Sequence, residues 1–74
     1  MSTYRMIEVV GTSDKSYEEA INTAIEDAKT HLENSNQTLE GVEWFQVIDQ
    51  RGRLIDGAVA EFQIRLNVAF TIKK

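Results

Sequence analysis

Trp44 is the only tryptophan in this chain of 74 residues, and its indole is the side chain best suited to holding a planar ligand. An indole can stack on an aromatic ring, or it can pack in an interface between subunits. Its spacing alone favours the interface. Gln63 lies in a predicted strand, where a solvated amide is the ordinary interpretation, although an amide can both donate and accept hydrogen bonds.

Catalytic arrangements are not expected from the other reactive residues. His31 is the only histidine, and the chain has no cysteine to act as nucleophile or metal ligand. The acidic pairs Glu18-Glu19 and Glu26-Asp27 are adjacent in a predicted helix, so the members of each pair point in different directions and are not expected to form an acid/base site. There is no glycine-rich phosphate loop. A calcium or magnesium site on clustered carboxylates, for example at a symmetry axis, stays open as an alternative.

The composition limits which classes of binding partner the protein is expected to have. The net charge of −4 and a pI near 4.8 argue against nucleic acids and anionic membranes, which need a basic surface. No apolar run is long enough for a membrane span or signal peptide, so we expect a soluble, cytoplasmic protein. A single domain over residues 1–74 buries little apolar surface, and without disulfides oligomerisation is the remaining way to stabilise it.

The second half of the chain predicts two long strands joined by a tight turn. Asp56-Gly57 is typical of a two-residue type I′ loop, in which both residues have positive φ. After this turn, apolar residues alternate with mostly polar ones, which predicts a strand with one buried face. The apolar positions are Ala58, Ala60, Phe62, Ile64, Leu66, Val68, Phe70 and Ile72. In the preceding strand, Phe45 and Val47 share one face, and Trp44, Gln46 and Ile48 share the other.

The first half predicts a strand over residues 4–10, ending at Gly11, and a helix that ends near Asn34. Ser16 and Glu19 have the spacing of a capping box at the start of this helix. An apolar stripe then recurs every three or four residues, as expected of a helix lying on a sheet. It consists of Tyr17, Ala20, Ile21, Ala24, Ile25, Ala28 and Leu32.

The predicted hairpin also fixes a register. If Ile55 faces Ala58, then Trp44 lies opposite Ala69 and Gln63 lies opposite Gln50. Trp44 and Gln63 would be six positions apart, or about 20 Å along the sheet. One ligand could then reach both only if they came from different chains, or if a bulge folded the strand back.

These elements predict an α+β fold in which a three-stranded antiparallel sheet, in chain order β-α-β-β, packs on one amphipathic helix. A single helix cannot cover such a sheet, and apolar residues such as Trp44, Ile48 and Val59 are left for an interface.

Three segments are similar to the dodecin family of small flavin-binding proteins, in order and over nearly the whole chain. They are Tyr4-Arg5-Met6-Ile7-Glu8-Val9-Val10-Gly11-Thr12-Ser13, Gly41-Val42-Glu43-Trp44-Phe45-Gln46-Val47 with Arg51-Gly52, and Asp56-Gly57-Ala58-Val59-Ala60-Glu61-Phe62-Gln63-Ile64. The connection over residues 34–41 is several residues longer than is usual in the family.

The resemblance implies a hollow homododecamer that binds a flavin, either FMN or riboflavin, without catalysing a reaction. By position, Trp44 would stack on the isoalloxazine ring and Gln63 would hydrogen-bond its polar edge. Asp49 would reach the ribityl chain and Arg51 the phosphate, although each is also readable as half of an ion pair. Many bacterial members carry an arginine after the last phenylalanine, where this chain has Thr71, and that difference favours riboflavin.

Two functions therefore follow from the sequence. The first is flavin storage with photoprotective quenching in a dodecameric shell, and whether coenzyme A also binds stays open. The alternative is a shell of the same fold that acts as a metal-binding or interaction protein and has lost flavin. A flavoenzyme is a third and weaker reading, since no residue is positioned to handle a proton.

Overall fold

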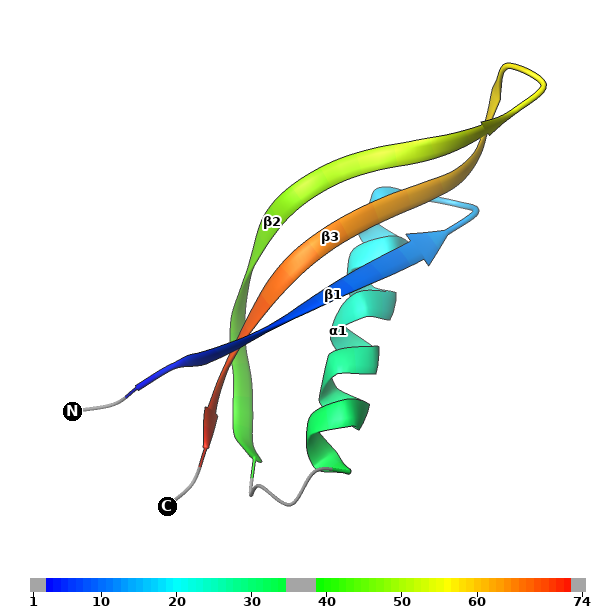
Figure 1. Cartoon of the computed structure of the whole chain (residues 1–74). Helices are drawn as coiled ribbons and strands as arrows, with labels where there is room; N and C mark the ends of the chain where they lie inside the picture. The colour runs from blue at the N-terminus through cyan, green and yellow to red at the C-terminus, as the bar shows by residue number, and fades with distance from the viewer. Residues whose placement is uncertain (1–2, 35–38, 73–74) are drawn as a thin grey trace.

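A computed structural model of the chain describes residues 3–34 and 39–72. The elements follow the order β1 (Arg5–Ser13), α1 (Tyr17–Glu33), β2 (Leu39–Ile55) and β3 (Ala58–Ile72). The strands form one antiparallel sheet in the order β1-β3-β2, so that the last strand is central. Helix α1 lies on one side of this sheet, which confirms the predicted α+β fold (Figure 1).

Strand β1 is longer than predicted. Instead of ending at Gly11 it runs to Ser13, because β3 continues beside it and pairs Gly11 with Ile64 and Ser13 with Phe62. Gly11 is buried under the helix, and an added Cβ there would lie 2.0 Å from the carbonyl oxygen of Ala20. This glycine therefore permits a close approach of the helix to the strand and does not break the strand.

The helix begins with half of the predicted capping box. The Ser16 hydroxyl accepts a hydrogen bond from the Glu19 amide at 3.0 Å, as expected of an N-cap. The reciprocal bond is absent, because the Glu19 carboxylate accepts from the Ser13 hydroxyl at 3.0 Å and the Ser16 amide donates to that same hydroxyl. Ser13 at the end of β1 thus fixes where the helix begins.

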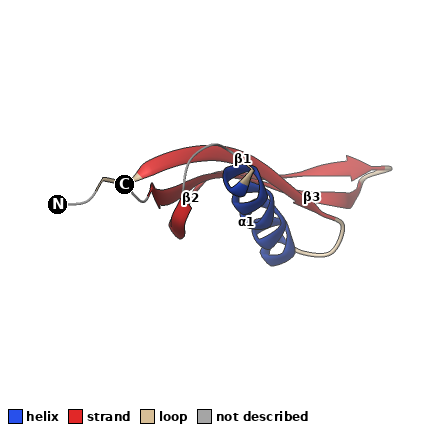
Figure 2. Cartoon of the chain, turned by 90° about the horizontal axis from the view of Figure 1, so that it is seen from below, coloured by secondary structure: helices blue, strands red, loops and turns tan. Residues whose placement is uncertain are grey.

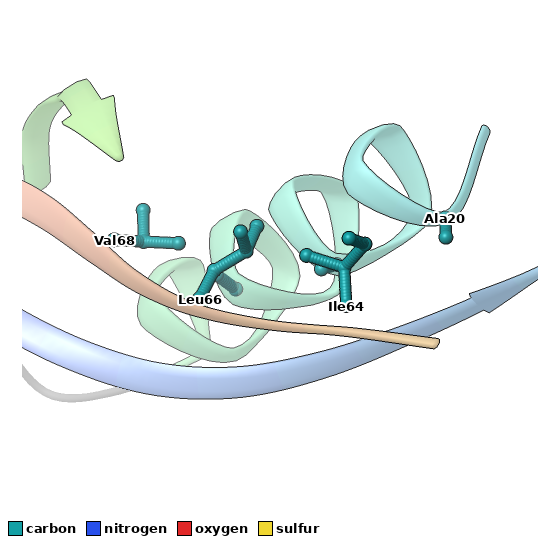
Figure 3. Packing of buried hydrophobic residues seen from close by; sticks show 6 residues of the cluster. Ala20, Ile64, Leu66 and Val68 are labelled. Carbon is teal, nitrogen blue, oxygen red and sulfur yellow. The ribbon is translucent and has the colours of Figure 1, made fainter. Parts of the chain in front are cut away.

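The core is a single layer between the helix and the two strands β1 and β3. Ala20, Ala24 and Ala28 bring the helix backbone close to Ile64, Leu66 and Val68 of β3, and all six are almost fully buried (Figure 3). The predicted stripe is therefore the buried face of α1. Seen from below, the helix lies along only part of the sheet, and the strands extend beyond it (Figure 2).

Much of the long hairpin extends beyond the helix. Asp56 and Gly57 have φ values of 52° and 80°, which confirms the predicted turn with two left-handed residues. The molecule is correspondingly elongated, with extents of 50 × 22 × 14 Å (Figure 1). On β2, Phe45 and Val47 face the helix side of the sheet but remain exposed, because α1 packs on β1 and β3. Large apolar surface is therefore left open on both sides of β2.

Candidate functional site

The side of the sheet that faces away from α1, here called the open face, carries all four predicted site residues. Three of them lie on β2: Trp44, Asp49 and Arg51. Their partners on β3 are Ala69, Arg65 and Gln63, respectively, and Gln63 is the fourth site residue. The residues on either side of these partners along β3, such as Ile64, Leu66 and Val68, are buried under the helix. Strand alternation then places Gln63, Arg65 and Ala69, with their β2 partners, on the open face.

A bulge at Ile48 makes this arrangement possible. In a regular strand, Asp49 and Arg51 would point to the opposite side from Trp44, because their positions differ from it by odd numbers. The pairing passes from Val47 with Leu66 directly to Asp49 with Arg65, so Ile48 is an extra residue without a partner. One extra residue shifts the alternation by one position, and the side chains beyond it change face.

The predicted pairing of Gln63 with Gln50 is wrong, and the predicted pairing of Trp44 with Ala69 is confirmed. A second irregularity explains both results. The pairing passes from Leu54 with Val59 to Arg53 with Glu61, which leaves Ala60 as an extra residue on β3. The extra residue Ala60 shifts the register by one position, so Gln63 faces Arg51 instead of Gln50. The bulge at Ile48, on the other strand, shifts the register back by one position before Trp44 is reached.

Polar and charged side chains form a connected row on the open face near the hairpin. Arg51 Nε donates to Gln63 Oε1 at 2.9 Å, and Gln63 Nε2 donates to Glu61 Oε1 at 2.7 Å. Arg51 also lies 3.9 Å from the Asp49 carboxylate, and Arg53 lies 3.6 Å from Glu61. The row offers an amide, a guanidinium and a carboxylate within one surface, which suits a ligand with several polar groups.

An aromatic pair occupies the other end of the open face. Trp44 is 44% exposed and lies edge-to-face with Tyr4, with ring centroids 5.9 Å apart and planes inclined by 65°. Edge-to-face packing favours one relative orientation of two rings. Tyr4 therefore restrains the indole while nearly half of the tryptophan stays open to another ring.

The aromatic pair and the polar row are well separated along the sheet. Trp44 pairs with Ala69 and Arg51 pairs with Gln63, so the two positions are six residues apart along β3. At the rise of a strand this corresponds to about 20 Å. Residues Trp44 and Gln63 of one chain are thus not brought together by the fold of that chain.

Thr71 lies beside the aromatic pair, where it pairs with Gly41. Its hydroxyl oxygen is buried and has no hydrogen-bond partner within residues 3–34 and 39–72. Neither Thr71 nor Gly41 brings a charge to this end of the open face. A phosphate group would find no cation at position 71.

Two residues of this surface were missed by sequence reasoning. Tyr4 was assigned only to the first strand, and Glu61 only to the polar face of the last strand. For Tyr4 alternation was a partial signal, since it shares a face with Met6, whose β3 partner Ala69 also pairs with Trp44; Tyr4 lies diagonal to the tryptophan. For Glu61 alternation was a signal as well, because it lies two residues before Gln63 on the same face of β3 and the two side chains are hydrogen-bonded.

Other functional arrangements are absent from the described residues. No group of three or more acidic, histidine or cysteine side chains is placed to hold a metal ion there. His31 is exposed in the last turn of α1. Within the same ranges, no helix is both long and apolar enough to cross a membrane.

Comparison with known proteins gives one consistent family. The family model described as Dodecin matches residues 3–73. The chain is 34% identical to a dodecin from Thermus thermophilus over 71 residues, which cover 96% of this chain and 93% of the relative. Among solved structures, the dodecin from Streptomyces davaonensis matches with a TM-score of 0.82 and 33% identity, covering 99% of this chain and 97% of that one. The dodecin from Streptomyces coelicolor matches with a TM-score of 0.80 and 36% identity, covering 99% and 94%.

Proposed function

The chain belongs to the dodecin family, and from this membership we propose that it is a non-enzymatic protein that binds and stores a flavin. Family membership supports flavin binding in general. The observation that carries the proposal for this chain is the exposed Trp44 on the same sheet face as Gln63, Asp49 and Arg51.

The residues of the open face fit the parts of a flavin. Trp44 offers an aromatic surface that is nearly half exposed, and Tyr4 holds it in one orientation. Gln63 can meet an edge that contains both donors and acceptors, and Asp49 can accept from hydroxyl groups of a ribityl chain. A bound flavin would supply a ring that absorbs light and accepts electrons. The indole of Trp44, in contact with the excited ring, can donate an electron and quench its emission.

Assembly belongs to the same proposal. The chain leaves Trp44 exposed on one side of β2 and Phe45 and Val47 exposed on the other. A surface of this kind, next to a core of few large side chains, is expected to be covered by further copies. We propose the hollow homododecamer implied by the family resemblance, with the helices outside and the open faces inside.

The choice of flavin follows from charge. A phosphate carries about −1.5 to −2 charges near neutral pH and is bound by arginine or lysine. On the open face, Arg51 is already engaged with Gln63 and Asp49, Arg53 is paired with Glu61, Arg65 is paired with Glu8, and position 71 is a threonine. We therefore propose that riboflavin binds at least as tightly as FMN. Tighter binding of FMN than of riboflavin, measured by titration, would contradict this.

The function is tested by titrating riboflavin and FMN into ligand-free protein while following flavin emission. We expect emission to be quenched up to an endpoint near one flavin per chain. Undiminished emission at saturating protein would favour the alternative of a shell that acts in metal binding or protein interaction.

A further inference from the structure

The amide of Gln63 is held between two charged residues on the open face. On one side, Gln63 Oε1 accepts a hydrogen bond of 2.9 Å from Arg51 Nε. On the other side, Gln63 Nε2 donates a hydrogen bond of 2.7 Å to Glu61 Oε1. The Glu61 side chain is only 28% exposed, and Arg53 Nε lies 3.6 Å from the same carboxylate oxygen.

The chemistry of these neighbours allows the amide only one orientation. A guanidinium can only donate hydrogen bonds, and an ionised carboxylate can only accept them. Rotating the amide by 180° would place its N–H groups against the Arg51 donor and its oxygen against the Glu61 carboxylate. Arg51 and Glu61 therefore decide which end of the amide is oxygen and which is nitrogen.

The amide keeps part of its hydrogen-bonding capacity. A primary amide has two N–H donors and an oxygen with two lone pairs. One donor is used by Glu61 and one lone pair by Arg51, which leaves one N–H and one lone pair. An adjacent donor and acceptor of fixed order complement a ring edge with an N–H next to a carbonyl group. The pyrimidine half of the flavin ring has such an imide edge.

We propose that Glu61 is a positioning residue that orients the Gln63 amide before the ligand arrives, and that this fixed order of donor and acceptor selects rings with an imide edge. The proposal rests on the flavin-binding function proposed above. Glu61 acts through Gln63 and needs no contact with the ligand. Arg53 contributes less, because its ion pair with Glu61 is long and the Arg53 side chain is exposed.

The size of the effect follows from preorganisation. Without Glu61, the glutamine side chain would have to be ordered when the ligand binds, which typically costs about two- to tenfold in affinity. Glu61→Ala is expected to weaken riboflavin binding by this factor. Glu61→Gln should recover most of the loss, since its carbonyl oxygen can still accept from Gln63 Nε2.

The decisive experiment is a double-mutant cycle. Riboflavin dissociation constants are measured for wild type, Glu61→Ala, Gln63→Ala and the double variant. If Glu61 acts through Gln63, Glu61→Ala changes affinity in the wild-type background and has no effect when position 63 is alanine. An equal effect in both backgrounds would overturn the proposal, because Glu61 would then act directly on the ligand or on the fold. Glu26→Ala, which removes an ion-paired carboxylate on the far side of the helix, is the control and should leave affinity unchanged.

Two further measurements test selectivity and orientation. Wild type should bind riboflavin more tightly than riboflavin methylated at the imide nitrogen, and Glu61→Ala should narrow this difference. In ligand-free crystals, Gln63 should occupy one rotamer in wild type and more than one in Glu61→Ala. A single unchanged rotamer in the variant would overturn the positioning role, even where wild type binds flavin. Failure of wild type to bind any flavin would overturn the proposed function.

Discussion

At the scale of single residues, Trp44 and Phe45 make a natural comparison. They are neighbours with nearly equal exposure, 44% and 42%, but they lie on opposite sides of the sheet. Only Trp44 shares a face with the polar row and with Tyr4. A ligand that stacks on the open face should therefore depend on one of these rings and not on the other.

Substituting Trp44 should separate binding from quenching. Trp44→Ala removes the stacking surface and should weaken flavin binding by roughly 1–3 kcal/mol, the usual value for stacking on an aromatic side chain. Trp44→Phe keeps a smaller ring but loses the good electron donor, so the bound flavin should regain emission while binding remains. The flavin affinity and the emission of the bound flavin are measured for each variant by titration with absorbance and fluorescence detection.

Phe45→Leu is the matched control: once light scattering shows that its assembly is intact, because Phe45 belongs to the surface expected to be covered by further copies, it should change neither affinity nor quenching. Full quenching by the Trp44→Phe variant would show that the indole is not the electron donor.

At the scale of secondary-structure elements, the contact between α1 and β1 depends on Gly11. A Cβ at this position would lie 2.0 Å from the Ala20 carbonyl oxygen and 2.7 Å from the Ala24 Cβ. Backbone on one side and a core side chain on the other leave no room, so the helix would have to move. Overpacking of this kind typically costs about 1–3 kcal/mol.

Gly11→Ala should therefore lower the thermal midpoint clearly, measured at a fixed chain concentration because assembly also affects the midpoint. Gly41→Ala is the control. A Cβ at Gly41 would meet only the end of the flexible Glu43 side chain, at 3.3 Å, and should change little. Equal midpoints for the two variants would contradict the close approach at Gly11.

The same elements show what the sequence could predict. The helix, the turn at Asp56-Gly57 and the pairing of Trp44 with Ala69 follow from local patterns, and the structure agrees with them. The pairing of Gln63 with Arg51 could not be predicted, because it lies between two bulges. Alternation of side chains gives no sign of which residue a strand leaves unpaired, since Ile48 and Ala60 fit a regular strand by type. The two shifts cancel, so an error at Gln63 coexists with a correct register at Trp44.

The side of the sheet on which Asp49 and Arg51 lie could not be predicted from the strand pattern either. A regular strand places Asp49 and Arg51 opposite Trp44, and only the bulge at Ile48 brings all three to the open face. Their selection as site residues came from the resemblance to a family and not from the strand pattern.

At the scale of the whole molecule, the exposed apolar residues on both sides of β2 lead to a prediction about mass. Light scattering on the purified protein should give about 100 kDa, twelve times the 8.4 kDa chain. The value should stay constant on dilution into the micromolar range, because a chain with such a small core gains much of its stability from assembly. A stable monomer or dimer at that concentration would contradict it.

The separation between Trp44 and Gln63 predicts how the site is distributed over the assembly. On β3, Gln63 and the Trp44 partner Ala69 are six positions apart, or about 20 Å. A flavin ring that stacks on one and hydrogen-bonds the other must then take them from two chains. The proposed site would exist only in the oligomer.

Mixing chains tests this distribution. Trp44→Ala and Gln63→Ala chains are unfolded, combined in equal amounts and refolded, and native mass spectrometry verifies that the oligomers are mixed. If each site takes its tryptophan and its glutamine from different chains, about one site in four (½ × ½) is intact. If both come from one chain, no intact site forms.

A second mixture of wild type with the double variant is the matched control, because the two arrangements predict different fractions there as well. Sites shared between chains again give about one intact site in four, whereas sites within one chain give about one in two. Full-affinity flavin binding near one quarter in both mixtures supports the shared site. Fractions of zero and one half in verified mixed oligomers would mean that one chain supplies both residues, and the sheet would then have to bend far more sharply between Ala69 and Gln63 than its register implies.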